Sequence, residues 1–265
     1  MKQVRLAFSG SGFLAPIHAG AACAFLAAGV QIVEVAGTSG GSIAAALIAS
    51  GKSSAQLKQI ALAEIPDNIM SVQPFGALFR WALNDGQVLH QWLRDAIGDR
   101  TFAQAIMPCT IVASDVRKQR GVILSGPRSP DLLLADACRM SASVPGVWAP
   151  VRYNGMRVAD GGMACNIPTD KLTQDTVPRV GIQVTDGNAP AKMDTLLDFA
   201  QGCIGTMLNS NEGNLVAWAK QTGATIVPVD ARPYGFLDAN LTLAERGDLF
   251  NRGYRAVQQQ LPQLA

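Results

Sequence analysis

Residues 31–50 read QIVEVAGTSGGSIAAALIAS, and this stretch decides the fold. Its first part, residues 31–36, is rich in Val and Ile, which predicts a strand. Its last part, residues 40–50, consists mainly of Ala, Ile and Leu, which predicts a buried helix. Almost no chain separates the two elements, and a strand that passes so directly into a helix is typical of a parallel α/β sheet.

The residues before this stretch supply a second strand and helix. Residues 4–8 predict a short strand. Residues 16–28 predict a helix with Pro16 in its first turn, where proline is favoured. With residues 31–36 they complete a strand–helix–strand unit, so the two strands are expected to lie parallel in one sheet.

The rest of the chain continues the alternation of strands and helices. Further strands are predicted at residues 109–114, 121–124, 156–159 and 180–185, and further helices at residues 88–97, 132–140, 194–219 and 243–261. Neither an internal repeat nor a linker rich in Gly, Ser or Pro divides them. We therefore expect a single α/β domain over residues 1–265.

Within this domain three regions are distinguished. The motifs described below lie in residues 3–186, and residues 194–265 supply the C-terminal helices. Residues 66–85 are crowded with apolar side chains that follow no clean period, so we expect them to form a cap or lid over the edge of the sheet.

Composition excludes several classes of protein. Of the 265 residues, 48% are hydrophobic and 16% charged, which is enough apolar material for a large core. A formal charge of +2 and the lack of a long Lys/Arg run argue against a nucleic-acid partner. The N-terminus lacks the apolar run of a secretory signal, and no window of about 18 uncharged apolar residues predicts a membrane span. A cytoplasmic protein is expected, with peripheral contact to a membrane left open.

The five cysteines are scattered and show no C-x-x-C spacing. This pattern does not indicate a zinc or redox site, and buried thiols in a reducing compartment explain it. We expect neither a metal nor an organic cofactor.

Residues 37–41 read GTSGG and match the pattern G-x-S-x-G between a predicted strand and a predicted helix. Gly37 and Gly41 permit a strained turn that presents the Ser39 hydroxyl. The helix that follows directs its unpaired N–H groups toward that hydroxyl, which favours the anion formed during acyl transfer. Ser39 is therefore the candidate nucleophile.

A serine nucleophile needs a base, and the histidines of this chain exclude the common triad. The usual order Ser, Asp, His requires a histidine downstream of the acid, but the two histidines are His18 and His90. A carboxylate must then be considered as the direct base. Asp160 ends an apolar run and is followed by Gly161 and Gly162, which allow a sharp turn that presents the side chain. From Asp-Gly-Gly alone, a simple turn is the more frequent explanation.

Gly10, Ser11 and Gly12 follow the first predicted strand and lead toward a helix. Backbone N–H groups in such a turn can hold an oxyanion. The same residues open a G-x-G-x-x-A pattern typical of dinucleotide binding, with Glu34 as a ribose ligand. That alternative predicts an oxidoreductase, and it leaves the motifs at Ser39 and Asp160 without a purpose.

Together these motifs resemble the patatin-like phospholipase family. Four blocks carry the resemblance, at residues 8–20, 37–42, 141–151 and 158–168. The resemblance implies a three-layer α/β/α sandwich with a mainly parallel central sheet. It also implies a lipid acyl hydrolase in which Ser39 and Asp160 form a catalytic dyad, an acyl-enzyme forms on Ser39, and the substrate is a lipid or another acyl ester.

The first turn departs from the family pattern at three positions. Ser11 replaces a glycine, Leu14 replaces a Lys or Arg, and Ala15 replaces another glycine. The lost basic side chain removes an electrostatic helper near the oxyanion. The departures motivate a second hypothesis, a catalytically weak member of the family that binds lipid or a protein partner.

Other polar residues are assigned ordinary structural roles. His18 lies on an apolar helix and is expected to be a satisfied core or cap residue, and His90 is expected even less to be a catalytic group. Asp115 and Asp136 lie near the ends of predicted elements, where Asp is common as a capping residue.

An apolar cluster in the expected cap has two explanations that remain open. Its members are Phe75, Leu78, Phe79 and Trp81. They could dock on a lipid surface, or they could pack as core beneath a cap. The segment is short of the Lys and Arg residues that anionic membranes attract.

Overall fold

The structure is a computed structural model that describes residues 2–73, 81–185, 194 and 196–264. Its eight-stranded sheet has the strand order β10-β9-β1-β2-β4-β8-β7, with β5 also paired to β4. The strands are β1 Gln3–Phe8, β2 Gln31–Thr38, β4 Cys109–Asp115, β5 Arg120–Ser125, β7 Val151–Tyr153, β8 Met156–Ala159, β9 Arg179–Thr185 and β10 Thr225–Asp230. A separate two-stranded sheet pairs β3 Ala82–Asn84 with β6 Gly146–Trp148.

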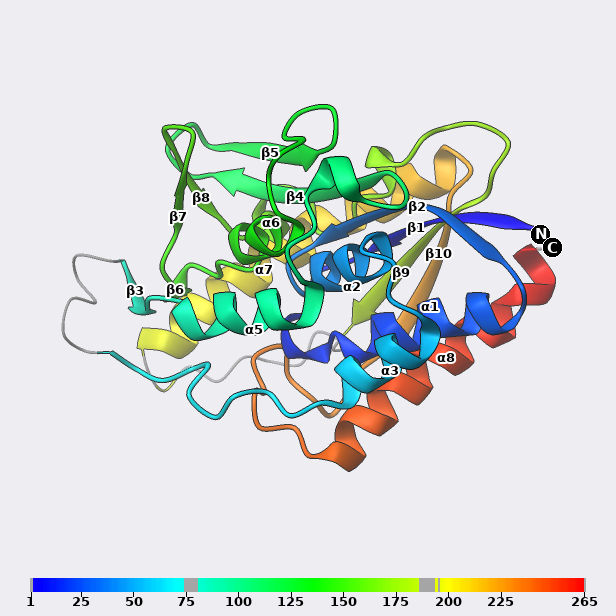
Figure 1. Ribbon diagram of the computed structural model, residues 1–265. Helices are drawn as coiled ribbons and strands as arrows, with labels where there is room; N and C mark the ends of the chain where they lie inside the picture. Colours follow the sequence, from blue (N-terminus) through cyan, green and yellow to red (C-terminus); the bar gives the residue numbers. More distant parts are fainter. Residues whose placement is uncertain (1, 74–80, 186–193, 195, 265) are drawn as a thin grey trace.

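Helices cover both faces of this sheet (Figure 1). They are α1 Pro16–Ala27, α2 Gly40–Ala49, α3 Ser54–Leu62, α5 Gln87–Ile97, α6 Leu134–Ser141, α7 Leu196–Gln221 and α8 Leu243–Leu264. α7 runs behind the sheet, whereas α1, α2, α3 and α8 lie in front of it. The five neighbouring strands β10, β9, β1, β2 and β4 are parallel, and β5, β7 and β8 add antiparallel pairings. The expected α/β/α sandwich with a mainly parallel sheet is confirmed.

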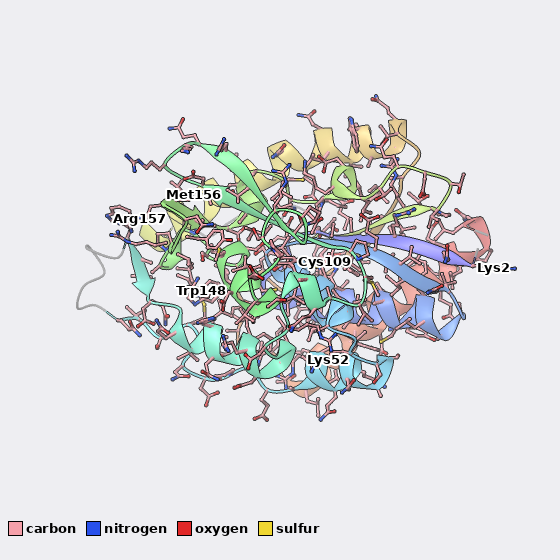
Figure 2. All side chains as sticks on the ribbon, turned by 45° about the horizontal axis from the view of Figure 1, so that its top comes forward. Lys2, Lys52, Cys109, Trp148, Met156 and Arg157 are labelled. Carbon is pink, nitrogen blue, oxygen red and sulfur yellow. The ribbon has the colours of Figure 1, made fainter. Side chains whose placement is uncertain are left out.

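Small residues let the helices approach closely. α1 and α8 cross where a side chain at Gly20 would lie 1.9 Å from the Phe250 carbonyl oxygen, and one at Gly253 would lie equally close to the carbonyl oxygen of Ile17. α1 is buried along most of its length, as expected for a helix without a polar face. Apolar residues fill the centre while charged ones reach the periphery, as Figure 2 shows for Cys109 and Lys2.

Besides the three-residue strands β3, β6 and β7, two longer elements, α3 and β10, were not predicted from the sequence. α3 is mostly exposed and has little apolar pattern, but Ser53 and Gln56 form a capping box that marks its start. β10 contains Pro228, which argues against a central strand; the strand lies at the edge of the sheet, where proline is tolerated. The predicted β2 also continues two residues further, to Thr38, so that the strand ends directly at Ser39.

The expected cap is described only in part. Phe75, Leu78 and Phe79 lie outside the described residues. Ile69 is buried, and its carbonyl oxygen accepts a hydrogen bond of 3.1 Å from the indole N–H of Trp148. Across the described ranges, no helix combines the length and apolar character needed to span a membrane.

Candidate active site

The end of β2 and the start of α2 hold Ser39 in a strained conformation. Ser39 has φ 50° and ψ −125°, a left-handed region that few non-glycine residues adopt. Its N–H donates to the Ser141 hydroxyl at 2.8 Å, and its carbonyl oxygen accepts from the Ser42 hydroxyl at 2.6 Å. Surrounding hydrogen bonds therefore fix the strained turn, as is typical of functional sites.

Gly37 and Gly41 are required by close approach of the backbone. A side chain at Gly37 would lie 2.4 Å from the carbonyl oxygen of Gly41. One at Gly41 would lie 2.4 Å from the carbonyl oxygen of Phe8 and 2.3 Å from that of Ser9. The G-x-S-x-G pattern thus packs the turn after β2 directly against the end of β1.

Asp160 lies beside Ser39 because β8 pairs with the end of β4. The Ser39 hydroxyl donates to Asp160 Oδ2 at 2.6 Å, and the Gly162 N–H donates to Asp160 Oδ1 at 2.7 Å. A side chain at Gly161 would lie only 2.0 Å from the Val112 carbonyl oxygen, which explains the glycine at that position. Sequence residues 121 positions apart are thereby brought into direct contact.

Burial changes the acidity of this carboxyl group. Asp160 is 5% exposed, and desolvation raises its pKa from 3.8 to about 6, against the opposing effect of the hydrogen bonds from Ser39 and Gly162. Near neutral pH the group is mostly ionised and can accept a proton from the serine hydroxyl. A pKa close to the working pH suits a general base.

The turn after β1 is organised differently from the prediction. The N–H of Gly10 donates to the carbonyl oxygen of Asn166 at 3.0 Å, so the expected oxyanion donor at Gly10 is corrected. The N–H groups of Ser11 and Gly12 have no hydrogen-bond partner among the described residues. A side chain at Gly40 would lie 2.9 Å from the Gly12 nitrogen, so these amides lie next to the start of α2.

The departures from the family pattern have different surroundings. Leu14 is completely buried and contributes to the core, which leaves no room there for a basic side chain. The Ser11 hydroxyl is buried and has no partner in the described part of the chain. Gly12 adopts φ +52°, and the next N–H, that of Phe13, donates to the Phe236 carbonyl oxygen at 2.9 Å.

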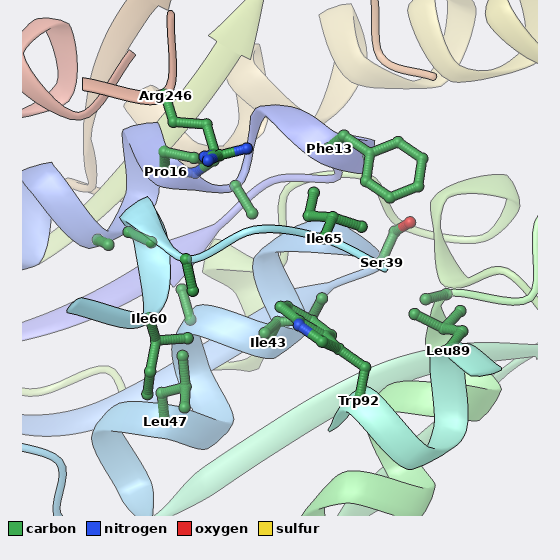
Figure 3. A pocket seen from close by; sticks show the side chains of 18 of the residues that line it. Phe13, Pro16, Ser39, Ile43, Leu47, Ile60, Ile65, Leu89, Trp92 and Arg246 are labelled. Carbon is green, nitrogen blue, oxygen red and sulfur yellow. The ribbon is translucent and has the colours of Figure 1, made fainter. Parts of the chain in front are cut away.

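Ser39 lines a pocket whose other walls are almost entirely apolar (Figure 3). α1, α2, α3 and α5 supply most of these walls, and Figure 3 shows Ile43, Trp92 and Leu89 facing the same space as Ser39. Ile65 and Ile69 add to the lining from the segment that follows α3. The candidate nucleophile thus lies at the wall of a pocket lined by apolar side chains.

Arg246 is the charged residue among those that line this pocket, and sequence reasoning missed it. It reaches the pocket from α8, beside Pro16, and is 6% exposed. Its Nη1 donates to the Leu241 carbonyl oxygen at 2.5 Å, while Nε has no partner within the described ranges. No local sequence signal links a residue in the last helix to a turn near the N-terminus.

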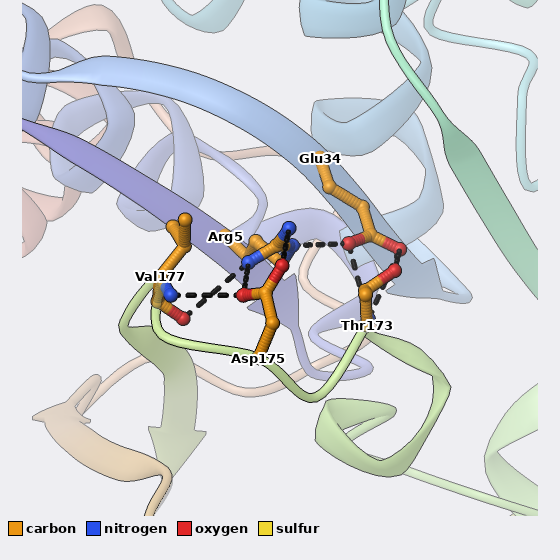
Figure 4. A network of polar contacts seen from close by, with 5 residues as sticks. All are labelled: Arg5, Glu34, Thr173, Asp175 and Val177. Carbon is orange, nitrogen blue, oxygen red and sulfur yellow. Dashed lines mark hydrogen bonds and ion pairs between the residues drawn. The ribbon is translucent and has the colours of Figure 1, made fainter.

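The structure contradicts the dinucleotide alternative. Glu34 lies in the middle of β2, away from the end of the strand where a ribose would bind. Figure 4 shows its carboxylate bonded on both sides, with an ion pair of 2.6 Å to Arg5 and hydrogen bonds from Thr173. Glu34 therefore ties β1 and β2 to the loop before β9.

His18 and His90 bond to groups other than Ser39. The buried Nδ1 of His18 has no partner in the described part of the chain, so His18 is not fully satisfied, contrary to expectation. His18 Nε2 contacts the Ser9 carbonyl oxygen at 2.9 Å, and complete burial lowers the pKa of His18 to about 4. His90 bonds to Asp136 at 2.7 Å. Asp115 accepts from the N–H of Arg117 and so closes the turn after β4. None of these side chains hydrogen-bonds to Ser39 in the described part of the chain.

Within the described ranges, no group of three or more His, Cys, Asp or Glu side chains is arranged so that it could hold a metal ion. Four cysteines are buried as free thiols, namely Cys23, Cys109, Cys138 and Cys165.

Comparison with known proteins identifies the class. The model of the patatin-like phospholipase family matches residues 6–173, more than half of the chain. The chain therefore belongs to the patatin-like phospholipase family, which places it at family level among the lipid acyl hydrolases.

Individual relatives are distant. The uncharacterized protein R571 of Acanthamoeba polyphaga mimivirus is 26% identical over 250 residues, which cover 88% of this chain and 84% of R571. VipD from Legionella pneumophila has a TM-score of 0.66 at 14% identity, over 99% of this chain and 67% of VipD. Human GIVD cytosolic phospholipase A2, solved with a methyl γ-linolenyl fluorophosphonate inhibitor, has a TM-score of 0.55 at 8% identity. The match covers 98% of this chain and 58% of the phospholipase chain. At such identities the solved structures share the fold alone.

Proposed function

We propose that this protein hydrolyses lipid acyl esters with Ser39 as nucleophile and Asp160 as general base. The observation that carries the proposal is the 2.6 Å hydrogen bond from the Ser39 hydroxyl to Asp160, at the wall of an apolar pocket. In the first step Asp160 takes the hydroxyl proton while Ser39 Oγ attacks the ester carbonyl carbon. The alcohol leaves with that proton, and the acyl group remains on Ser39.

In the second step, water takes the place of the serine hydroxyl as the nucleophile. Asp160 takes a proton from a water molecule that attacks the acyl-enzyme, and the proton then returns to Ser39 as the fatty acid leaves. The N–H groups of Ser11, Gly12 and Gly40 are the proposed donors to the oxyanion in both steps. They have no partner among the described residues, and the positive end of the α2 dipole adds to their effect.

The pocket indicates which part of the substrate binds where. Its apolar walls fit an acyl chain, because burying hydrocarbon there releases water from both surfaces. Arg246 is placed to bind a negatively charged group of the substrate, or to stabilise negative charge in the pocket.

The test is hydrolysis of a panel of acyl esters by wild type, Ser39→Ala and Asp160→Asn, combined with fluorophosphonate labelling. We expect a loss of at least about 10⁴-fold for Ser39→Ala and at least about 10³-fold for Asp160→Asn. Labelling of the wild type should disappear in Ser39→Ala. Ser50→Ala and Asp136→Asn are matched controls outside the pocket and should retain activity.

The outcomes separate the two hypotheses. Hydrolysis by Ser39→Ala at the wild-type rate would exclude the mechanism. A wild type that cleaves no ester and takes no label would instead favour the catalytically weak protein that binds lipid or a partner through this pocket.

A further inference from the structure

A second cavity, which we call the arginine groove, adjoins the apolar pocket. Trp148 lines both. The groove also includes Ser143 and Ala159, and the Ser143 carbonyl oxygen accepts the N–H of Asp160 at 3.0 Å. A molecule seated in the groove is therefore next to the residues that hold the proposed base.

Arginine supplies the charge of this groove. Its charged lining residues are Arg117 in the turn after β4, Arg152 on β7 and Arg157 on β8. None of the three forms an ion pair with a carboxylate within the part of the chain described by the structure. Three unneutralised cations on one surface are notable in a chain whose formal charge is only +2.

The pairing of β7 with β8 places two of these cations directly opposite each other. Arg152 and Arg157 are register partners in this antiparallel pair. Like charges in this arrangement destabilise a sheet. An anion held between the two guanidinium groups would remove the repulsion, so the arrangement itself points to a negatively charged partner.

Large apolar side chains border the same groove. Trp81 is 61% exposed and Val116 is 52% exposed, and both belong to the lining. The Arg157 guanidinium carbon lies 4.6 Å from the centre of the Trp81 ring. Trp81 adopts φ 59°, an unfavourable backbone conformation for a bulky residue. Exposed tryptophan beside arginine is the combination that proteins place at the boundary between water and lipid.

We propose that the arginine groove docks this protein onto the surface of an anionic phospholipid bilayer. The three arginines would bind lipid phosphates, while Trp81 and Val116 would insert among the headgroups. Figure 2 shows Met156 and Arg157 at the end of the molecule opposite Lys2. Docking would present lipid beside Trp148, at the wall of the Ser39 pocket. This last step rests on the proposed function, whereas docking itself does not.

The experiment measures binding without turnover. The full chain with Ser39→Ala is sedimented with vesicles of phosphatidylcholine alone, or of phosphatidylcholine with about one third phosphatidylglycerol, as the charged lipid. We expect binding to the anionic vesicles, weaker binding at high salt, and little binding to the neutral ones.

Substitutions in the same Ser39→Ala background locate the surface. Arg152→Gln and Arg157→Gln should each weaken binding to anionic vesicles about fivefold. Trp81→Ala should weaken the binding that remains at high salt. Arg255→Gln is the matched control, because Arg255 is exposed on α8, outside the groove. Melting temperatures would show that each variant is folded.

Each result decides for or against the groove. Equal binding to neutral and anionic vesicles, no binding to either, or an equal loss with Arg255→Gln would overturn the proposal. Selective loss with Arg152→Gln and Arg157→Gln would support it. If the vesicles bind but wild type cleaves no ester, the docking surface stands and the proposed hydrolysis fails.

Discussion

The two glycine-rich turns at the ends of β1 and β2 differ in how their polar groups are bonded. In the turn after β2, the N–H, carbonyl oxygen and hydroxyl of Ser39 all have hydrogen-bond partners. In the turn after β1, the N–H groups of Ser11 and Gly12 have none among the described residues. The polar groups of Ser39 are thus all bonded, whereas two N–H donors in the turn after β1 stay available. This difference is what a fixed nucleophile beside a site for a transient anion requires.

The largest expected effect comes from Gly41, where the two turns touch. Gly41→Ala would place a methyl group within 2.4 Å of backbone oxygens at the end of β1, which cannot move cheaply. We expect a loss of about 3 kcal/mol or more in the free energy of unfolding, measured in urea. Gly247→Ala in α8, where no atom lies within 4 Å, should instead gain up to about 1 kcal/mol. If Gly41→Ala were as stable as wild type, the close contact between the two turns at Gly41 would be contradicted.

The ionisation of Asp160 gives the next effect, on stability. Its folded pKa of about 6 lies above the ordinary 3.8, so between these values the native state holds a proton that the unfolded chain has lost. Stability therefore falls as pH rises through this window, by about 3 kcal/mol in all. Asp160→Asn does not ionise, so it should be more stable than wild type at pH 8. Urea unfolding should show that this advantage shrinks toward pH 4.

The same ionisation gives a pH profile for activity. Ionised Asp160 is the proposed base, so hydrolysis should rise with pH and level off above the pKa of about 6. Between pH 7 and pH 5 we expect roughly a tenfold fall in kcat/KM on a soluble ester. A flat profile across this range would contradict Asp160 as the base.

Substitution of Ser141 is expected to have a smaller effect on the turn after β2. It accepts the Ser39 N–H and donates to the Val112 carbonyl oxygen at 2.6 Å, so Ser141→Ala removes two buried hydrogen bonds. We expect a loss of about 2 kcal/mol in stability and a lower kcat with little change in KM. Ser50→Ala removes a single bond at the C-terminal end of α2, from the Ser50 hydroxyl to the Leu47 carbonyl oxygen, and is the control. Unchanged kcat in Ser141→Ala would show that the turn after β2 does not need this support.

The smallest effect is expected in the first turn. Ser11→Gly restores the residue typical of the family and removes a buried hydroxyl without a partner. Removing the unpaired hydroxyl stabilises the folded state, whereas glycine gives the unfolded chain more conformational entropy. The two contributions should nearly cancel, so we expect the free energy of unfolding to change by less than about 1 kcal/mol. If backbone amides alone hold the oxyanion, kcat/KM should change less than about threefold. A loss of tenfold or more would make the hydroxyl itself a donor.

The sequence predicted the elements that carry local patterns. The strands before Ser11 and Ser39, and the helices after them, follow from apolar periodicity and small residues. α3 could also have been found, because the capping box at Ser53 and Gln56 is a local signal. Ser39 and Asp160 were identified because each directly follows a strand and lies next to glycine.

The remaining features depend on contacts between distant parts of the chain. Ser141 meets the Ser39 N–H across 102 positions, and Asn166 takes the N–H of Gly10 across an even longer span. Arg246 reaches the pocket from the last helix, and the arginine groove gathers side chains from separate turns and strands. No spacing in the sequence encodes such contacts, because the sheet order brings them together.

The position of β1 in the sheet has a consequence for dissecting this protein. β1 lies between β2 and β9, and β9 begins at Arg179, beyond the residues 6–173 matched by the family model. A fragment trimmed to the matched residues would leave one side of β1 without its neighbour, with a row of unpaired N–H and C=O groups open to other chains. Such a fragment should self-associate through that edge. The end of the region matched by the family model therefore falls inside the folding unit.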